Sequence, residues 1–317
     1  TGETRTLTDT LDRSIADIQW SDNSKRIWIG YDDLGVGRAA EVDLNGKLRK
    51  AEIVIGGTAI GRPYTSGAFS VAGDARLAFT QGRDDRPADI AVFRPGKAPL
   101  QLTDLNSDLM GQRQMARVER LVWPSSHDEL MIDGWVMKPP GFDPSRQYPM
   151  ILEIHGGPHA AYGPNYSTEA QLYAAAGYVV FYTNPRGSTS YGDTFANEID
   201  LAYPGYDYDD LMSGVDALIE KGFVDPTQLF VTGGSGGGVL TAWIVGKTDR
   251  FRAAVVAKPV INWASFVLTA DVNYYFATTW FDAPPWEDYE SYWRRSPLSL
   301  VGNVSTPTML LTGENDY

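Results

Sequence analysis

Residues 229–238 read LFVTGGSGGG, and the apolar run VLTAWIV follows directly at 239–245. The first part is rich in β-branched and aromatic residues and predicts a strand, the glycine cluster predicts a tight turn, and the second run has helical spacing. Within this stretch, 233–237 matches the G-x-S-x-G pattern of a nucleophile elbow, in which a serine hydroxyl projects above the edge of a sheet. Ser235 is therefore the candidate nucleophile.

The glycines around this serine have a physical reason. The serine of an elbow adopts unfavourable backbone angles, which bring strand and helix atoms so close that a Cβ at Gly233 or Gly237 would clash. The same turn points the first amides of the helix at the group under attack, where they can hold a developing oxyanion. The pattern alone is weak, since flexible loops and phosphate-binding turns also contain glycines. No Lys-Ser or Lys-Thr pair of a P-loop follows, however, and no G-x-G-x-x-G frame with an acidic partner is present, so the elbow is favoured.

The composition is that of a globular protein with room for two domains: 317 residues, 43% hydrophobic and 12% aromatic. A net charge of −13 disfavours nucleic acid and anionic membrane surfaces as partners. The lack of cysteine excludes disulfides and thiolate metal sites, and no apolar run approaches the roughly 20 residues of a membrane-spanning helix. We expect a soluble protein with no metal or cofactor, and we leave open the cytoplasm or periplasm and assembly into a homo-oligomer.

The N-terminal part contains a repeat. Residues 18–29 recur at 68–79, and 42–47 recur at 92–97, so the offset is about 50 residues. Each longer copy predicts a strand, a polar turn and a second strand. A period of about 40 to 50 residues with four short strands is typical of a β-propeller blade. The repeat therefore predicts blades of a propeller.

The edges of this repeat indicate an incomplete propeller. Residues 2–9 resemble the closing strand of a blade at 96–104, so the chain starts inside a blade. Two blades and a remnant cannot close, because propellers need roughly four to eight blades and an open array exposes strand edges. We expect residues 1–117 to be a partial propeller of about two blades in a piece of a longer polypeptide. A small β-sandwich is the alternative.

From residue 148 onward, strands alternate with helices, which predicts an α/β domain with a mostly parallel, doubly wound sheet over residues 118–317. An antiparallel hairpin over 118–124 and 130–137 precedes it. Predicted strands cover 150–154, 178–182, 229–234, 253–257 and 308–312, and predicted helices cover 168–176 and 207–220.

Three of these strands end in segments that could carry chemistry. HGGP at 155–158 follows the first, Ser235 follows the second, and GEND at 313–316 follows the third. Ligands bind at the carboxyl ends of parallel strands, so we expect the three segments to meet. Asp316 suits the acid that orients a catalytic base, although a loop-capping aspartate is an equal alternative.

The base itself is missing from the expected place, because the chain order in this fold is serine, acid, histidine. All three histidines precede Ser235. His127 is expected as a solvated turn residue and His155 as a ring that holds the glycine turn, while His159 could line the cleft but is in the wrong place for the base. We expect the catalytic histidine to lie beyond Tyr317.

Two further features suggest substrate binding. Residues 263–293 contain eleven aromatic side chains, more than a core needs, so part of this cluster is expected to form the wall of a pocket for an apolar group. Trp263, Phe266 and Tyr274 are the candidates, with simple packing as the alternative for each. Arg186, at another strand end, could hold a substrate carbonyl or carboxylate, and an internal salt bridge is its alternative.

Five motifs in this order resemble the prolyl oligopeptidase family of serine peptidases, with the acylaminoacyl-peptidase and dipeptidyl-peptidase-like branch as the nearest likeness. They are HGGP at 155–158, NPRGSTSYG at 184–192, DYDDLMSGVD at 207–216, GGSGGG at 233–238 and GEND at 313–316. The likeness covers nearly all of residues 118–317, with the blade repeats in front where the family carries its propeller.

The resemblance implies an α/β-hydrolase fold capped by a propeller that admits short peptides. It implies Ser235 as nucleophile, Asp316 as triad acid, and the backbone N–H groups of Gly157 and Gly236 as the oxyanion hole. The family often has tyrosine after the serine, so Gly236 keeps the backbone donor but leaves the substrate preference open. The family histidine would follow residue 317, which predicts an inactive segment. A serine peptidase acting on short peptides through an acyl-enzyme is expected; a carboxylesterase, or a propeller binding module with an inactive hydrolase domain, is the alternative.

Overall fold

The computed structural model of the chain describes residues 2–22, 24–73 and 75–316, apart from the side chains at 273 and 274. Within these residues, none of the helices is both long enough and apolar enough to cross a lipid bilayer. The chain forms two compact units. The first runs up to Glu119 and includes Ala161–Leu172 and Thr189–Thr194; the second comprises Arg120–Ala160, Tyr173–Ser188 and the residues from Phe195 onward. The sequence places a single boundary between 117 and 118, whereas two later segments of the chain also pack with the first unit.

The first unit contains two four-stranded antiparallel sheets, each with its strands in sequence order. One sheet is formed by β1 (Ile15–Trp20), β2 (Arg26–Asp33), β3 (Val36–Asp43) and β4 (Leu48–Lys50), and the other by β5 (Phe69–Val71), β6 (Leu77–Gln81), β7 (Asp89–Phe93) and β8 (Leu100–Gln101). The predicted strand–turn–strand repeat is confirmed, since its two copies cover β1–β2 and β5–β6. The β-propeller itself stays a prediction. Apolar side chains of both sheets, such as Trp28 and Phe79, share one buried core.

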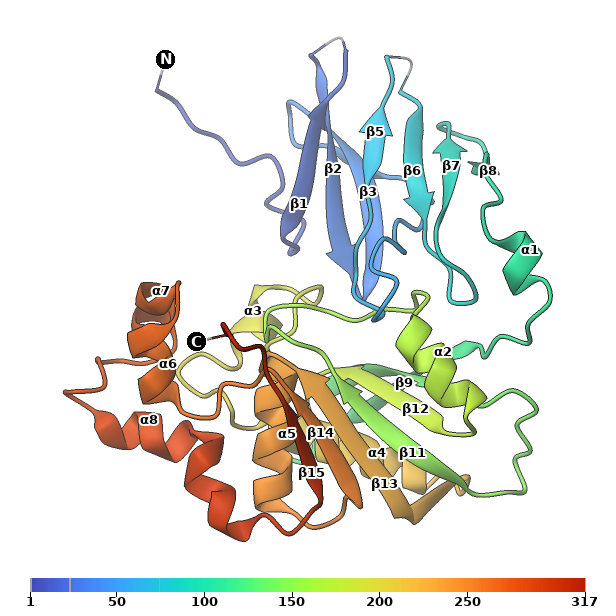
Figure 1. The fold of residues 1–317 in the computed structure, drawn as a ribbon. Helices are drawn as coiled ribbons and strands as arrows, with labels where there is room; N and C mark the ends of the chain where they lie inside the picture. The colour runs from blue at the N-terminus through green and yellow to red at the C-terminus, as the bar shows by residue number, and fades with distance from the viewer. Residues whose placement is uncertain (1, 23, 74, 317) are drawn as a thin grey trace. The chain divides into compact units, whose positions relative to one another are not determined.

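The second unit is built on a seven-stranded sheet with the order β15-β14-β13-β11-β12-β10-β9 (Figure 1). Its strands are β9 (Val118–Pro124), β10 (Met131–Met137), β11 (Tyr148–Ile154), β12 (Val179–Asn184), β13 (Val224–Gly234), β14 (Ala253–Ala257) and β15 (Thr308–Leu311). Parallel pairs connect β12, β11, β13, β14 and β15 in space, and β10 pairs antiparallel with β12. The predicted, mostly parallel sheet is confirmed, and the carboxyl ends of its parallel strands lie at one edge.

Helices and one 3₁₀ segment connect the strands. They are α1 (Ser107–Met110), α2 (Thr168–Ala175), α3 (Asp193–Asn197), α4 (Asp207–Ile219), α5 (Gly236–Lys247), α6 (Trp263–Thr269), α7 (Asn273–Thr279), α8 (Tyr289–Arg295) and η1 (Pro297–Asn303). Ser167 caps the start of α2, because the amide of Ala170 donates to its hydroxyl. On α4, Leu211, Val215 and Leu218 are fully buried, as the helical spacing predicts. Helix α5 packs against β11, β13 and β14 (Figure 1), so it starts at the edge where the parallel strands end.

Candidate active site

Ser235 occupies a single-residue turn between β13, which ends at Gly234, and α5, which begins at Gly236. Its φ of 58° and ψ of −120° lie outside the regions that residues with a Cβ prefer. Such strain costs on the order of 1–3 kcal/mol and persists only where the surroundings enforce it. The side chain of Ser235 is exposed. The predicted strand–turn–helix elbow with an outward-facing serine is therefore confirmed.

The glycines at the elbow allow a close approach of three chain segments. A Cβ placed on Gly237 would lie 2.1 Å from the carbonyl oxygen of Ile154, and one on Gly233 would lie 2.4 Å from that of Gly237. Both distances are far below a van der Waals contact, so side chains at these positions would force the strand ends apart. The clash expected from the sequence is present, and it explains why the motif needs glycine on both sides of the serine.

The residue after the serine lies directly against the HGGP turn. A Cβ on Gly236 would lie 2.8 Å from the oxygen and 3.0 Å from the nitrogen of Gly157. The backbone of Gly157, with φ of 122°, therefore lies so close to the first residue of α5 that no side chain fits between them. These are the two residues whose N–H groups were expected to form the oxyanion hole.

A cavity of about 280 Å³ opens beside the elbow. Ser235, Gly157, Gly236 and Asp316 all line it. The three strand ends that the sequence singled out are thus brought together in one place. Backbone amides and a hydroxyl that converge on one cavity can bind and attack a carbonyl group, with the amides available for the negative charge that develops on its oxygen.

Aromatic side chains form one wall of this cavity. Trp263 and Phe266 of α6 line it, as expected, together with Phe276 of α7 and Trp280, which directly follows α7. Val260 and Ile261, in the loop after β14, extend the apolar surface. Lys258 and Asn262 of the same loop also line the cavity. The side chain of Tyr274, the third aromatic candidate, lies outside the described residues. The expectation that part of the aromatic cluster surrounds a pocket is met by four of its members.

None of the three histidines is among the described residues that line this cavity. His155 is buried, with Nδ1 2.6 Å from the carbonyl oxygen of Gly156 and Nε2 2.9 Å from Oγ of Ser188. Burial lowers its pKa from the usual 6.5 to about 4, so the ring is neutral at neutral pH. His159 contacts the carbonyl oxygen of Gly187 through Nδ1 at 3.0 Å. Both rings connect the HGGP turn to the loop after β12, which agrees with the holding role expected for His155.

His127 is exposed, and its ring stacks on Tyr206 with 3.4 Å between the ring centres. This is the solvated turn position that the sequence predicts. None of the cavity-lining residues in the described part of the chain is a histidine. The expected location of the base beyond residue 317 therefore stays a prediction, and so does the pairing of Asp316 with it.

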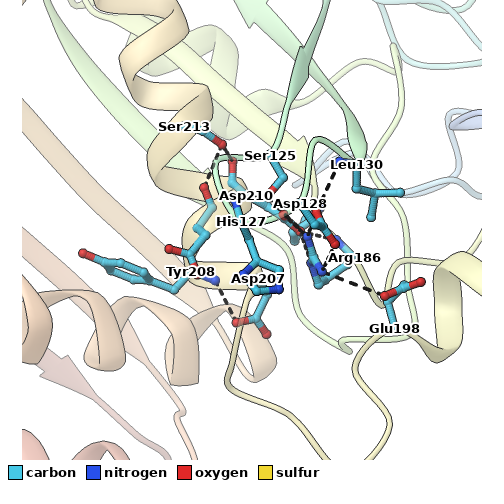
Figure 2. A network of polar contacts seen from close by, with 12 residues as sticks. Ser125, His127, Asp128, Leu130, Arg186, Glu198, Asp207, Tyr208, Asp210 and Ser213 are labelled. Carbon is cyan, nitrogen blue, oxygen red and sulfur yellow. Dashed lines mark hydrogen bonds and ion pairs between the residues drawn. The ribbon is translucent and has the colours of Figure 1, made fainter.

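Arg186 follows β12 but is not among the residues of the cavity. Its side chain is 2% exposed, and Nη2 donates to Asp128 and Asp210 at 2.9 Å each and to Ser125 at 3.3 Å. Figure 2 shows the guanidinium between these side chains, with Glu198 at the rim. The carboxylates raise the pKa of Arg186, against the effect of burial. The internal salt bridge is thus the alternative that the structure supports, because the fork has no free face for a substrate.

Two residues that support the cavity, Tyr203 and Arg295, have no signal in the local sequence. Tyr203 lines it from the loop before α4, and Arg295, at the end of α8, bonds to the residues of its wall. No local pattern surrounds either residue, and 92 positions separate them. The one available signal is their type, since buried tyrosine and arginine side chains pair most of their polar atoms with other groups of the protein.

Residues 164–317 match the Prolyl oligopeptidase family. The chain belongs to that family over this range. The resemblance inferred from the five motifs is therefore confirmed. The uncharacterized peptidase YuxL of Bacillus subtilis is 42% identical over 235 residues, which are 74% of this chain and 36% of that protein. Dipeptidyl-peptidase 5 of Schizosaccharomyces pombe is 30% identical over 232 residues, 70% of this chain and 34% of that protein.

The solved acylaminoacyl peptidase of Pyrococcus horikoshii has a similar structure, with a TM-score of 0.85 and 26% identity over 98% of this chain and 48% of that one. This prolyl oligopeptidase family member thus has a mixed α/β domain whose central, mostly parallel sheet matches the hydrolase domain of that enzyme. The chain spans about a third of the length of the two curated relatives and about half of the solved structure.

Proposed function

We propose that the full natural protein is a serine peptidase that cleaves short peptides through an acyl-enzyme on Ser235. Acylaminoacyl- and dipeptidyl-type cleavage are the two forms of this activity that the named relatives suggest. The observation that carries the proposal is the meeting of Ser235, Gly157, Gly236 and Asp316 around one cavity with an aromatic wall. Membership of the prolyl oligopeptidase family supports it.

In the proposed reaction, the hydroxyl oxygen of Ser235 attacks the carbonyl carbon of the scissile amide, and its proton passes to a histidine base. The carbonyl oxygen becomes an oxyanion, which the backbone N–H groups of Gly157 and Gly236 hold. The C–N bond then breaks, and the leaving amine takes the proton from the histidine. Water hydrolyses the resulting ester, which releases the acyl fragment and restores the serine hydroxyl.

Asp316 is assigned to orient this histidine and to stabilise its charged form. Because none of the three histidines of residues 1–317 is among the described residues that line the cavity, the proposal assigns the base to a position beyond Tyr317. Residues 1–317 alone should then be inactive, since the loss of one triad member costs several powers of ten in rate.

The aromatic wall suits a large apolar side chain next to the cleaved bond. Phe266 and Phe276 are half-buried, so each still presents ring surface to an incoming group. Burial of a phenylalanine or leucine side chain against them would contribute about 1.5–3 kcal/mol. The proposal therefore includes a preference for apolar residues on the acyl side of the bond.

The test is the Ser235→Ala variant of the full natural chain, assayed on N-acyl peptide amides and on matched esters. A loss of about 10⁴-fold or more in kcat is expected, because no other group can form the acyl-enzyme. Ser265→Ala changes another exposed serine of the same cavity and should stay within about tenfold of the unchanged protein. An unchanged rate in Ser235→Ala contradicts the proposal. If the unchanged protein turns over the esters alone, it is a carboxylesterase. If the unchanged protein turns over neither substrate, it is a binding module with an inactive hydrolase domain.

A further inference from the structure

Arg295 connects three of the residues that form the cavity beside Ser235. Its Nε donates to the carbonyl oxygen of Tyr203 at 2.8 Å, and its Nη1 donates to that of Trp280 at 2.6 Å. The indole N–H of Trp263 donates to the carbonyl oxygen of Arg295 at 3.1 Å. Tyr203, Trp263 and Trp280 all line the cavity, whereas Arg295 lies behind them.

Tyr203 carries this connection to the elbow. Its ring, 1% exposed, packs edge-on against Trp263 and Trp280, and its hydroxyl donates to the carbonyl oxygen of Gly236 at 2.8 Å. Burial raises the pKa of this hydroxyl well above its usual 10, with the negative charge of Asp207 adding to the effect. The hydroxyl therefore keeps its proton at any working pH and remains a donor.

The elbow needs such a restraint. Gly236 begins a run of three glycines, and glycine has more backbone freedom to lose on folding than any other residue. The N–H of Gly236 is one of the two proposed oxyanion donors, and its carbonyl belongs to the same residue. A hydroxyl that holds this carbonyl restrains the peptide group between Gly236 and Gly237. Because the N–H of Gly236 lies on the adjoining peptide, this restraint narrows the φ and ψ angles through which the N–H can change direction.

The burial of the charged side chain of Arg295 is unfavourable for the stability of the protein. Arg295 is 8% exposed, burial lowers its pKa to about 10, and its Nη2 has no hydrogen-bond partner among the described residues. The side chain remains charged at neutral pH, so two of its nitrogens form strong, charge-assisted bonds to backbone carbonyls of the cavity wall. Apolar residues of similar size often stabilise a protein more than a buried charge does, so a role in geometry is favoured.

We propose that Tyr203 and Arg295 are positioning residues for the reaction at Ser235. Arg295 fixes the carbonyl groups of Tyr203 and Trp280, and Tyr203 in turn fixes the peptide of Gly236 through its hydroxyl. Neither residue transfers a proton or contacts the nucleophile in this proposal. The inference rests on the proposed function, because it assigns these two residues to the support of Gly236, whose N–H is one of the proposed oxyanion donors.

The test compares Tyr203→Phe with Tyr292→Phe in the full natural chain. Tyr292 is a matched control, since it is also fully buried and its hydroxyl donates to a backbone carbonyl, that of Ala283, at 2.9 Å. Tyr203→Phe keeps the ring and removes only the donor. Loss of an oxyanion donor itself costs about 10²–10³ in kcat, so loss of its support is expected to lower kcat about tenfold with KM within about twofold.

Tyr292→Phe should lose a similar amount of thermal stability but keep kcat within about twofold. Arg295→Lys keeps the charge but replaces the planar guanidinium, which reaches the two carbonyls from separate nitrogens, with a single ammonium nitrogen. It should lower kcat and also raise KM, because the carbonyls of Tyr203 and Trp280 are held less rigidly. Equal kcat in Tyr203→Phe and the unchanged protein would overturn the inference, as would an equal fall in both tyrosine variants.

A second readout does not depend on catalysis. Hydrogen exchange of the amides at 236–238 should be about fivefold or more faster in Tyr203→Phe than in Tyr292→Phe, because the start of α5 loses a restraint. Unchanged exchange would overturn the positioning role even in an active enzyme. If Ser235→Ala keeps full activity, the proposed function fails, and the exchange measurement still decides whether Tyr203 holds the elbow.

Discussion

Ser235 and Arg186 occupy comparable places in the sheet but differ in their exposure to solvent. Each follows a buried strand that pairs with β11, β13 for the serine and β12 for the arginine. Ser235 is exposed and lines a cavity, whereas the guanidinium of Arg186 is enclosed by Asp128 and Asp210 (Figure 2). The carboxyl end of a parallel strand is where ligands bind, but only a side chain left open to solvent can use that position.

The difference arises from what surrounds each strand end. Ser235 has glycine neighbours, and the loops near it, at Gly157 and Asp316, leave room between them. Arg186 meets two carboxylates, one from the turn between β9 and β10 and one from the first turn of α4. A long cation with several donors satisfies its own polar atoms inside the protein, which removes it from the binding surface.

The largest effect in this comparison is expected at Asp316, which lines the cavity together with Ser235. Asp316→Asn in the full natural chain should lower kcat by about 10⁴-fold, because an amide cannot stabilise the charged form of the base. Glu314→Gln, two residues earlier in the same exposed loop, should stay within about twofold. Steady-state kinetics on an N-acyl peptide amide measures both, and a similar fall in the two variants would remove Asp316 from the triad.

Arg186 should show the reverse profile, with a loss of stability and little loss of activity. Arg186→Met leaves the fully buried carboxylate of Asp210 without its cation, so about 3–5 kcal/mol of unfolding free energy should be lost. Arg250→Met is the control, since its ion pair with Asp216 is exposed and worth less than about 1 kcal/mol. Denaturant unfolding measures the loss. If kcat/KM of the folded Arg186→Met variant falls a hundredfold, Arg186 binds the substrate and its internal ion pairs are not its main role.

His155 tests whether the ring beside the HGGP turn is structural. Its pKa is about 4 in the folded protein and near 6.5 when unfolded, so only the unfolded chain takes up the proton as the pH falls below 6.5. The stability that the neutral ring contributes is present above pH 6.5 and is lost as the pH falls toward 4. At pH 5 the loss relative to pH 7 should be about 2 kcal/mol.

His155→Gln should reduce this pH dependence, whereas His127→Gln, on the exposed turn, should keep it. Unfolding midpoints at pH 5 and pH 7 provide the measurement. An unchanged slope in His155→Gln would mean that another group carries the acid sensitivity.

The smallest effect concerns the aromatic cluster, of which only part forms the pocket. Phe266→Ala should raise KM about tenfold for substrates with phenylalanine on the acyl side, because apolar surface is removed from the cavity wall. Trp286→Ala should change KM by less than about twofold, since Trp286 is 75% exposed and is not among the cavity-lining residues. A large increase in KM for Trp286→Ala and a small one for Phe266→Ala would place the apolar subsite elsewhere in the cluster.

The sequence predicted the parts of this site that local patterns encode. The elbow follows from residues 229–245, in which strand, glycine turn and helix succeed one another. The convergence of 155–158, 235 and 313–316 follows from the geometry of parallel strands. Composition indicated an aromatic pocket over 263–293, but it did not distinguish Trp280, in the wall, from Trp286 on the surface.

The parts of the site that the sequence did not predict depend on hydrogen bonds and ion pairs between residues far apart in the chain. The environment of Arg186 is set by residues 58 positions before it and 24 after it, and Tyr203 meets Arg295 across 92 positions. No periodicity connects such positions, so one sequence cannot show which buried charge will find a partner. The same limit applies to the first unit, where the repeat predicts each four-stranded sheet, whereas the assembly of such sheets into a propeller stays a prediction.

The most direct test of the central claim is the site of modification by a fluorophosphonate, which reacts with serines that a base and an oxyanion hole activate. The full natural protein would be labelled, digested and analysed by mass spectrometry. The account predicts a single adduct on Ser235, absent from Ser235→Ala and slower to form in Tyr203→Phe. An adduct on a different serine, or none in the folded protein, would contradict it.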